Sequence, residues 1–351
     1  MAPKIKEENI TTTTTNTSNG IGSYSSNPKV TKLPLRDAPP SLHTVSLWVC
    51  FIGIFVSLLP SLENDIDTKA TVNVLTQRVF PNYISLFTLG MIRVGMALTI
   101  WCISIYTICF DSEGIFVATN YKSPKTKLIN TSFSLTGFKT LTMFTHWSWI
   151  MLGISFSLNG AIALDTYFGY HHHITKWMLR IGLISFEIAA PISFLVSAVV
   201  AHVIWPNCIN LSDLQHPRTL VWHNFNIIFS LVEVCLLGGI PVHFSHIAFA
   251  PLYGCLYVLF AWNTTNIYTS TTKYGPQFLY HFFDTTVPKE SSIALVALLL
   301  VLMVAYTIFS NIHSVLDIVD SAIGGSGDGD GSIITHMIAV CLVASLVCRV
   351  R

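Results

Sequence analysis

Charged side chains are scarce in this chain of 351 residues. Lysine, arginine, aspartate and glutamate make up 11% of it, against about 25% in an ordinary soluble domain. Hydrophobic residues make up 52%, and the mean hydropathy of +0.58 is too high for a single water-soluble core. The formal net charge is +1, which leaves no large basic surface for nucleic acid. We expect an integral membrane protein that does not bind nucleic acid.

The usual signatures of catalytic and metal sites are also missing. The sequence has no Gly-rich phosphate loop, no GxSxG motif and no HExxH motif. Its eight cysteines lack CxxC spacing, so we interpret them as small buried hydrophobic residues. The triplet His171–His173 and the pair His243 and His246 lack the HxxHH partner blocks of membrane di-iron enzymes. We interpret them as solvated loop histidines and expect no cofactor and no metal ion, with a metal site as the lesser alternative.

Long apolar runs are what the chain has in abundance. Seven are long enough for the roughly 20-residue helix that crosses a ~30 Å hydrocarbon layer. They lie at 43–62, 84–109, 141–164, 179–204, 221–241, 247–268 and 290–313. An eighth run, at 333–348, is shorter and marginal. Because backbone groups must be paired internally in lipid, the sequence predicts an all-α, polytopic transmembrane helix bundle of seven or eight helices.

Polar segments flank the predicted bundle at 43–313. Residues 1–42 are rich in Thr, Ser and Asn and begin without an apolar signal-peptide core, so we expect a disordered tail before a retained first span. Residues 314–351 contain a Gly/Asp linker, GGSGDGDGS, and then the marginal apolar segment. With eight spans, 14 lysines and arginines lie on one side of the membrane and three on the other. The positive-inside rule then predicts a cytoplasmic N-terminus, in either the endoplasmic reticulum or the plasma membrane.

Three charged residues lie deep inside the predicted spans. At 1.5 Å per residue, Arg93, Glu187 and Glu233 all lie about 12–14 Å from the non-cytoplasmic side. An unpaired charge at that depth is costly. We therefore predict that Arg93 pairs with Glu187 or Glu233, and that the other glutamate is protonated or hydrogen-bonded as a neutral acid.

Two polar residues lie near the predicted cytoplasmic starts of their spans. Thr145 and His223 are three to five residues inside, so they lie at about the same depth. A threonine at a helix start is often a cap, and His, Trp and Tyr are common at the membrane interface. In the stretch FTHWSW at 144–149 we expect Trp147 and Trp149 to be interface anchors, with His146 a bystander or a supporting donor. Position alone does not assign chemistry to Thr145.

The stretches FTHWSWIMLGISF and WHNFNIIFSLVE resemble the androgen-induced family of multi-pass membrane proteins and the related rolling-stone proteins. In that family a threonine opens the second helix of a six-helix core. A histidine opens the fourth helix, and a glutamate follows it ten positions later. The matching residues here are Thr145, His223 and Glu233, and AAPISF and YHFFD are weaker points of similarity. The resemblance covers 84–313 and implies a six-helix core with a first span and a C-terminal span added.

The resemblance also implies a function. Androgen-induced members hydrolyse fatty-acid esters of hydroxy fatty acids, with this threonine and this histidine as the catalytic pair. By similarity, Thr145 would be the nucleophile and His223 the general base of an intramembrane threonine hydrolase acting on lipid esters. Rolling-stone members are linked to cell fusion instead, which leaves a non-enzymatic membrane protein as the alternative: a transporter, a receptor or a fusion or interaction protein. The sequence does not define an oligomeric state.

Overall fold

The structure is a computed structural model of the chain. It describes residues 41–111, 115–123, 126–207, 215–264, 279–285, 287–323 and 330–349. Residues 1–40 of the predicted tail and most of the Gly/Asp linker therefore lie outside the described residues.

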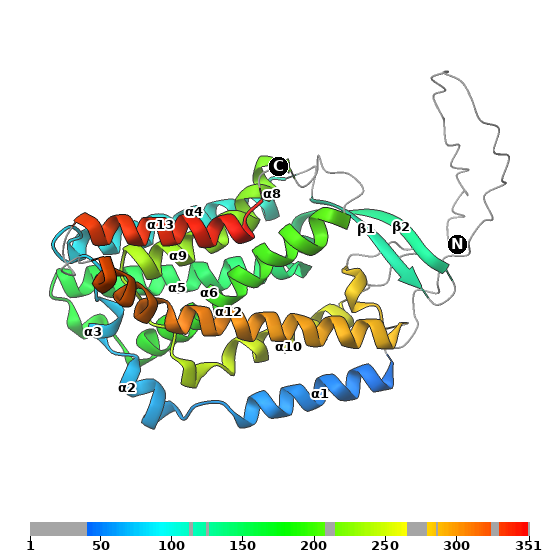
Figure 1. Cartoon of the computed structure of the whole chain (residues 1–351), viewed down its shortest axis with the longest axis horizontal. Helices are drawn as coiled ribbons and strands as arrows, with labels where there is room; N and C mark the ends of the chain where they lie inside the picture. The colour runs from blue at the N-terminus through cyan, green and yellow to red at the C-terminus, as the bar shows by residue number, and fades with distance from the viewer. Residues whose placement is uncertain are drawn as a thin grey trace, which may run out of the picture. The chain divides into compact units, whose positions relative to one another are not determined.

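The described chain is a helical bundle (Figure 1). Six of its helices are long and apolar enough to cross a membrane. Three of them are single helices: α4 (Leu86–Cys109), α5 (Phe144–Tyr167) and α12 (Pro288–Ile323). Two are helices extended by a short turn: α6 (Lys176–Val199) continues into η4 (Val200–Ile204), and α10 (Phe249–Asn263) follows η7 (Phe244–His246). The remaining span is a run of three elements, α8 (Pro217–Leu220), η6 (Val221–Phe225) and α9 (Asn226–Leu236). These six match the six spans predicted within 84–313. The all-α polytopic bundle is confirmed, and the protein is an integral multi-pass membrane protein.

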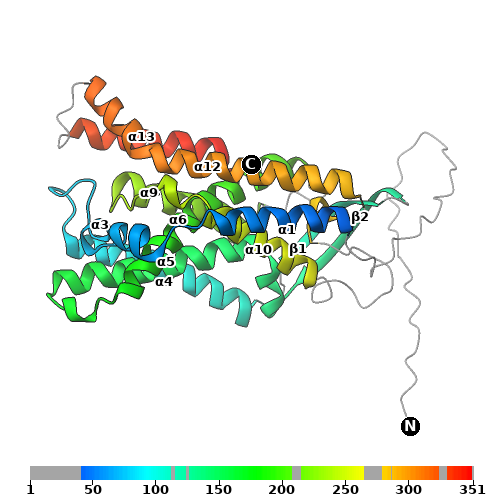
Figure 2. The same ribbon diagram turned by 90° about the horizontal axis from the view of Figure 1, so that it is seen from below.

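The predicted first span is a shorter helix with a sharp bend after it. α1 (Leu42–Ser57) has 16 residues, and the chain turns by 57° into η1 (Leu62–Ile66) and α2 (Asp67–Lys69), before α3 (Val72–Leu75). Pro60 lies at the bend, where its missing N–H cannot continue the helix. α1 packs beside α10 and α12 (Figure 2), and Trp48 donates from Nε1 to the carbonyl of Cys255 at 3.0 Å.

The marginal C-terminal segment is also helical. α13 (Asp330–Val347) packs mainly against α9 and also contacts α12 (Figure 1). Its apolar part, Ser332–Val347, is shorter than the six core helices. The marginal apolar run expected here is thus a helix, and whether it spans the membrane stays a prediction.

A β-hairpin lies in the polar connection between α4 and α5. β1 (Ile115–Ser123) pairs with β2 (Thr126–Leu135) in antiparallel register, with Ile115 opposite Leu135. Hydropathy did not predict it, although Val, Ile, Thr and Phe are residues that favour strands. Short helical turns complete the connections: η2 (Gly137–Thr142), η3 (His171–His173), η5 (Trp205–Asn207) and η8 (His281–Phe283).

The fifth predicted span, 221–241, is too long. α9 ends at Leu236, and the chain from 237 to 243 continues without helix while remaining largely buried. Gly239 has a φ of +63°, which only glycine adopts without strain, and Pro241 cannot donate a helical hydrogen bond. This segment is as apolar as a helix, so hydropathy could not separate it from the span.

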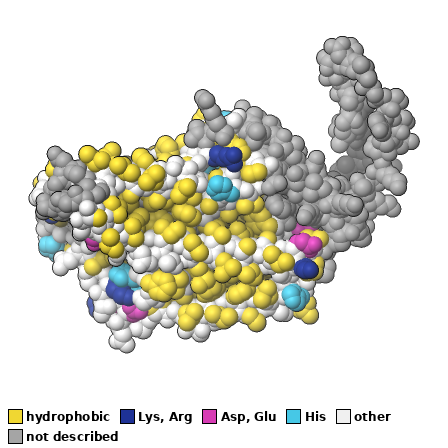
Figure 3. All heavy atoms as spheres, in the orientation of Figure 1, with side chains coloured by type: hydrophobic (Ala, Val, Ile, Leu, Met, Phe, Trp, Pro, Cys, Tyr) yellow, Lys and Arg dark blue, Asp and Glu magenta, His cyan; other side chains and the backbone are white. Residues whose placement is uncertain are grey.

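The surface of the bundle is largely apolar. Figure 3 shows a face covered by hydrophobic side chains that only a few charged ones interrupt. α4 and α12 contribute exposed residues such as Leu98, Ile105, Leu300 and Val304. Apolar patches of this extent are rare on soluble monomers and are what helices facing lipid require.

Candidate functional site

Thr145 lies in the first turn of α5 and is almost fully buried, with 4% of its surface exposed. It forms part of the wall of a pocket between α1, α6, α10 and α12. The other lining side chains are almost all aliphatic or aromatic, among them Leu195, Val199 and Leu298. Thr145 thus contributes to the wall of a pocket whose other lining is apolar, as an acyl-chain site requires.

His223 lies on the neighbouring helix, in the π-helical turn η6 between α8 and α9. Helical π-turns are frequent at functional sites, because they re-aim side chains and release backbone groups. The carbonyl of His223 accepts a hydrogen bond from the Ser197 hydroxyl. The imidazole is buried, and its Nδ1 has no hydrogen-bond partner.

The structure places the two predicted catalytic residues on adjacent helices, Thr145 in the first turn of α5 and His223 in the second turn of the run that begins at Pro217, but does not bond them to each other. Asn226 on α9 donates to Ser148 on α5 at 2.8 Å, which joins the helices one turn beyond Thr145 and His223. Among the described residues, no hydrogen bond joins Thr145 to His223, and His223 is not part of the pocket wall. No described side chain orients His223 through Nδ1.

Several buried polar atoms between α5 and η6–α9 lack a partner. Both ring nitrogens of His146 are buried and unpaired, as is Asn226 Oδ1. The His146 ring packs edge-on against Trp222, with 4.6 Å between ring centroids. A buried polar group without a partner is rare in a native protein and needs an explanation, such as water or a ligand. His146 is therefore buried and donates no hydrogen bond to a described group, and whether it is a bystander to the chemistry stays a prediction.

Two tyrosine hydroxyls also lie at this end of the pocket. The Tyr257 hydroxyl donates to the carbonyl of Thr142 at 2.8 Å, and the Tyr280 hydroxyl interacts with Tyr257 and with the backbone of Phe144. The backbone N–H groups of His146 and Trp147 in the first turn of α5 bond to the carbonyl of Met143, at 3.0 and 3.4 Å. Since the Tyr257 proton is also taken, the Tyr280 hydroxyl is the group here that could stabilise an oxyanion. The sequence alone did not identify it.

The two tryptophans of FTHWSW behave differently. Trp147 is half-buried, donates to the carbonyl of Leu141 at 3.0 Å and packs on Tyr253, as an interface anchor can. Trp149 has no exposed surface and stacks on Phe229, with 6.1 Å between centroids. The prediction that Trp149 is an interface anchor is wrong, because its side of α5 faces α9.

Arg93 forms the predicted intramembrane ion pair, and its partner is Glu233. Arg93 Nε and Nη2 donate to the two carboxylate oxygens at 3.1 and 2.5 Å. Nη1 donates to the carbonyls of Leu75 and Asn159 at 2.6 and 3.3 Å. Neither side chain of the pair is exposed to solvent. All three nitrogens of the Arg93 guanidinium therefore donate hydrogen bonds, as a buried charge requires.

The other glutamate, Glu187 on α6, is hydrogen-bonded to two histidines, and its predicted neutral form stays a prediction. Its carboxylate contacts His243 Nδ1 at 2.9 Å and His246 Nδ1 at 2.6 Å. His246 is completely buried and His243 is half-buried. The interpretation of these two as solvated loop histidines is wrong, because the segment after α9 folds back into the bundle. The triplet His171–His173 is exposed, as predicted.

The chain matches no protein-family model, no curated protein and no solved structure. Its resemblance to the androgen-induced family therefore rests on the quoted motifs.

Proposed function

We propose that the protein is an intramembrane hydrolase of lipid esters, such as fatty-acid esters of hydroxy fatty acids, in which Thr145 is the nucleophile. The observation that carries the proposal is the position of Thr145 in the wall of an otherwise apolar pocket. An acyl chain needs a long apolar pocket, and its ester carbonyl needs a nucleophile at the wall. The resemblance of FTHWSWIMLGISF and WHNFNIIFSLVE to the androgen-induced family supports the same assignment.

In the proposed mechanism the Thr145 hydroxyl attacks the ester carbonyl and passes its proton to His223. The tetrahedral intermediate collapses to an acyl-threonine and releases the hydroxy fatty acid, which takes up the proton. Water then cleaves the acyl-threonine, with the histidine acting again as base. The Tyr280 hydroxyl, in the pocket wall and in contact with the backbone of Phe144 beside Thr145, is the proposed donor to the oxyanion.

His223 acts in this mechanism through a hydrogen bond that forms when substrate is bound. Catalytic hydrogen bonds are often long in substrate-free enzymes and tighten in the complex. The unpaired Nδ1 of His223 leaves the ring free of a competing partner among the described residues. The π-turn that carries it, η6, is a local irregularity that a small helical adjustment can shift.

We place the active end of the bundle, with the N-terminus, on the cytoplasmic side. The excess of lysine and arginine, 14 against 3, supports this orientation. An ester in the cytoplasmic leaflet would then keep its acyl chain in hydrocarbon and present its carbonyl to Thr145.

The test is hydrolysis of a fluorogenic long-chain fatty ester by the protein purified in detergent. Thr145→Val keeps the side-chain volume and removes the hydroxyl, so it should abolish turnover. His223→Gln should lower kcat by about 10²–10⁴-fold, the usual contribution of a general base. The controls are Thr99→Val, an exposed threonine on α4, and His172→Gln in the exposed triplet, which should leave the rate unchanged.

A non-enzymatic role is the second candidate, and one observation favours it. Arg93, Glu233 and Glu187 are buried ionisable groups inside membrane-spanning helices, and such groups often mark ion or substrate paths. No turnover of any long-chain ester by the wild type would leave this candidate in place of the hydrolase. Full activity of Thr145→Val would instead contradict Thr145 as the nucleophile.

A further inference from the structure

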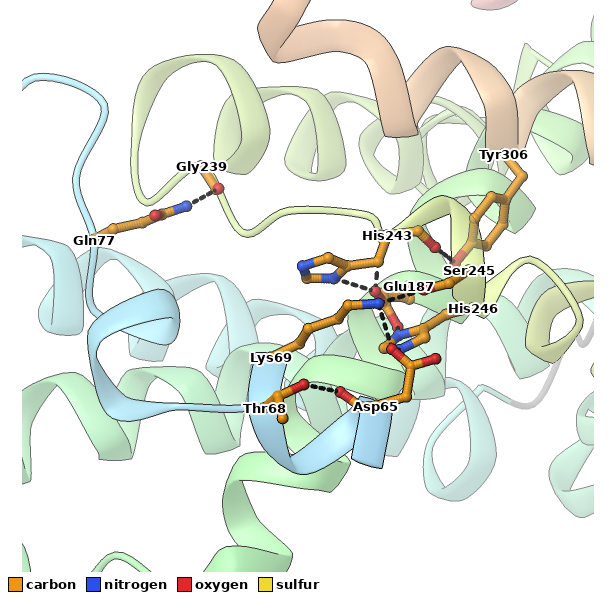
Figure 4. Close-up of polar contacts among 10 residues, drawn as sticks. All are labelled: Asp65, Thr68, Lys69, Gln77, Glu187, Gly239, His243, Ser245, His246 and Tyr306. Atoms are coloured by element: carbon orange, nitrogen blue, oxygen red, sulfur yellow. Dashed lines mark hydrogen bonds and ion pairs between the residues drawn. The ribbon is translucent and has the colours of Figure 1, made fainter. Parts of the chain in front are cut away.

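A cluster of potential metal ligands lies farther along α6 than the pocket, near the segment after α9 and the bend after α1 (Figure 4). Glu187 comes from the middle of α6, and His243 and His246 come from the segment between α9 and α10. One ligand atom from each lies within 4.8 Å of the other two. Along α6, Glu187 is roughly 12–18 Å from pocket residues Leu195 and Val199. The cluster is thus separate from Thr145.

The Glu187 carboxylate has no lysine or arginine partner among the described residues. Arg93 is paired with Glu233, and Lys69 with Asp65 at 2.5 Å. Glu187 itself is completely buried and contacts the backbone N–H and Nδ1 of His243, both at 2.9 Å, and His246 Nδ1 at 2.6 Å. A buried carboxylate needs a positive charge or a proton close by. Here that charge must come from the histidines or from an ion between them.

His246 lies between two carboxylates. Its Nδ1 faces Glu187, and its Nε2, buried and without a hydrogen-bond partner, faces Asp65 Oδ1 at 3.6 Å. A neutral imidazole has one N–H and one lone pair, so it would turn its lone pair to one of the two carboxylates. A cation on the Nδ1 side removes the conflict: the lone pair binds the ion, and Nε2–H points to Asp65. A carboxylate behind a metal-bound histidine is a recurrent arrangement in metal sites.

Two imidazole nitrogens and one carboxylate oxygen are the donor set of a zinc-type site with one open position. With bond lengths of 2.0–2.1 Å, ligand atoms around a tetrahedral ion are about 3.3 Å apart. His243 Nδ1 lies 2.9 Å from Glu187 Oε1 and His246 Nδ1 lies 2.6 Å from Oε2, and one ligand atom of each residue lies within 4.8 Å of the other two. The groups are thus close enough for one ion to replace the present hydrogen bonds after the side chains adjust.

The surroundings of the cluster support a built site with access. The Tyr306 hydroxyl donates to the carbonyl of His243 at 3.0 Å, which holds that segment against α12. Lys69 contacts both Asp65 and the Ser245 hydroxyl (Figure 4). The side chains of His243 and Asp65 are 22% and 29% exposed. An ion can therefore reach the ligands from solvent, although Glu187 and His246 are buried.

We propose that Glu187, His243 and His246 bind one divalent cation of the zinc class, with water in the fourth position and Asp65 holding the His246 ring. The ion would fasten the segment after α9 to α6, and Asp65 would connect both to the bend after α1. In this proposal the charge of the Glu187 carboxylate is balanced by the cation, whereas the sequence led us to expect a protonated glutamate. Since the metal displaces the proton from imidazole, its affinity should rise with pH.

The probe is Co²⁺ added to chelator-treated protein that carries no polyhistidine tag. We expect about one Co²⁺ per chain and the intense visible absorption of a four-coordinate site, with displacement by Zn²⁺. Glu187→Gln and His243→Asn should both lose the ion. Asp65→Asn should keep it with about 10–100-fold weaker affinity, the usual effect of removing a supporting carboxylate.

The exposed triplet His171–His173 is the matched control, because surface histidines bind metal adventitiously. Replacing all three by Asn should leave stoichiometry and spectrum unchanged. His243→Asn removes the most exposed ligand, so it is informative even if Glu187→Gln fails to fold. Loss of Co²⁺ in the triplet variant, or full retention in His243→Asn, would overturn the proposal, as would wild-type protein that binds no Co²⁺. None of these outcomes depends on ester hydrolysis, so the site and the hydrolase can fail separately.

Discussion

Arg93 on α4 and Glu233 on α9 are joined by two hydrogen bonds inside the bundle, although 140 residues separate them in the sequence. The pair fixes the rotation of each helix about its axis, because both carboxylate oxygens and two guanidinium nitrogens must meet. The remaining guanidinium nitrogen binds the carbonyls of Leu75 and Asn159. One buried arginine thus links α4, α9, α5 and the turn at α3.

Loss of one member of this pair should destabilise the fold severely. Arg93→Leu leaves Glu233 as an uncompensated buried carboxylate, which costs about 3–5 kcal/mol. We expect little monodisperse protein by fluorescence-detected size-exclusion chromatography. The double variant Arg93→Leu/Glu233→Leu removes both charges and should yield more folded protein than either single variant. Wild-type yield and thermal stability for Arg93→Leu alone would show that the pair contributes nothing.

Gly238 should be intolerant of any side chain. A Cβ at this position would overlap Arg93 Nη2 and Glu233 Oε1, so the backbone after α9 passes directly over the ion pair. Gly238→Ala should lower the melting temperature of the detergent-solubilised protein as strongly as Glu233→Gln does. The matched control is Gly95→Ala on α4, where no atom lies within 4 Å of the new Cβ. Equal melting temperatures for the two alanine variants would contradict this account of the close approach.

The pocket should set the length of acyl chain that the protein accepts. Val196→Trp places a large ring in the pocket wall contributed by α6. We expect it to raise KM for long-chain esters by about tenfold or more, while short-chain esters, which leave the deep part empty, are hydrolysed as by the wild type. The comparison needs two esters that differ only in chain length. An equal loss of activity toward both esters would indicate that the substitution distorts the site. Unchanged activity toward both would mean that the acyl chain of the substrate does not occupy this pocket.

Orientation can be tested through glycosylation. The N-x-S/T acceptors at Asn130 and Asn210 follow spans that we predict to end in the cytoplasm, so both should stay unmodified in a eukaryotic membrane. An endoglycosidase-sensitive shift should appear only when an acceptor loop is inserted between Tyr170 and His171, on the opposite side. A glycan at Asn130 in the unaltered chain would reverse the proposed orientation.

Hydropathy predicted the elements of this fold well and their ends less well. Six runs within 84–313 became six long helices, because twenty apolar residues in lipid have few alternatives to a helix. The run at 221–241 did not end where expected. Gly238 and Gly239 count as neutral or apolar in a hydropathy window, yet they allow the chain to leave the helix over Arg93. The hairpin at 115–135 has no apolar run to reveal it.

The candidate sites were predictable only in part. Depth along a helix follows from counting residues, so the partners of Arg93 could be reduced to two glutamates. The direction of a side chain depends on the rotation of its helix, which is why Trp149 was assigned to the interface and lies in the core. His246 was assigned to a solvated loop because nothing local in the sequence indicates that the segment after α9 folds inward. No single sequence signal could have assembled Glu187, His243 and His246, which come from two distant segments.

The most direct test of the central claim is to identify the residue that a lipid-like fluorophosphonate modifies. The wild-type protein should be labelled, and mass spectrometry should place the adduct on Thr145. Thr145→Ser, which keeps a hydroxyl at the same place in the pocket wall, should still be labelled, whereas Thr145→Ala should not. Labelling that persists in Thr145→Ala, or an adduct on any other residue, would contradict the assignment of Thr145 as the nucleophile.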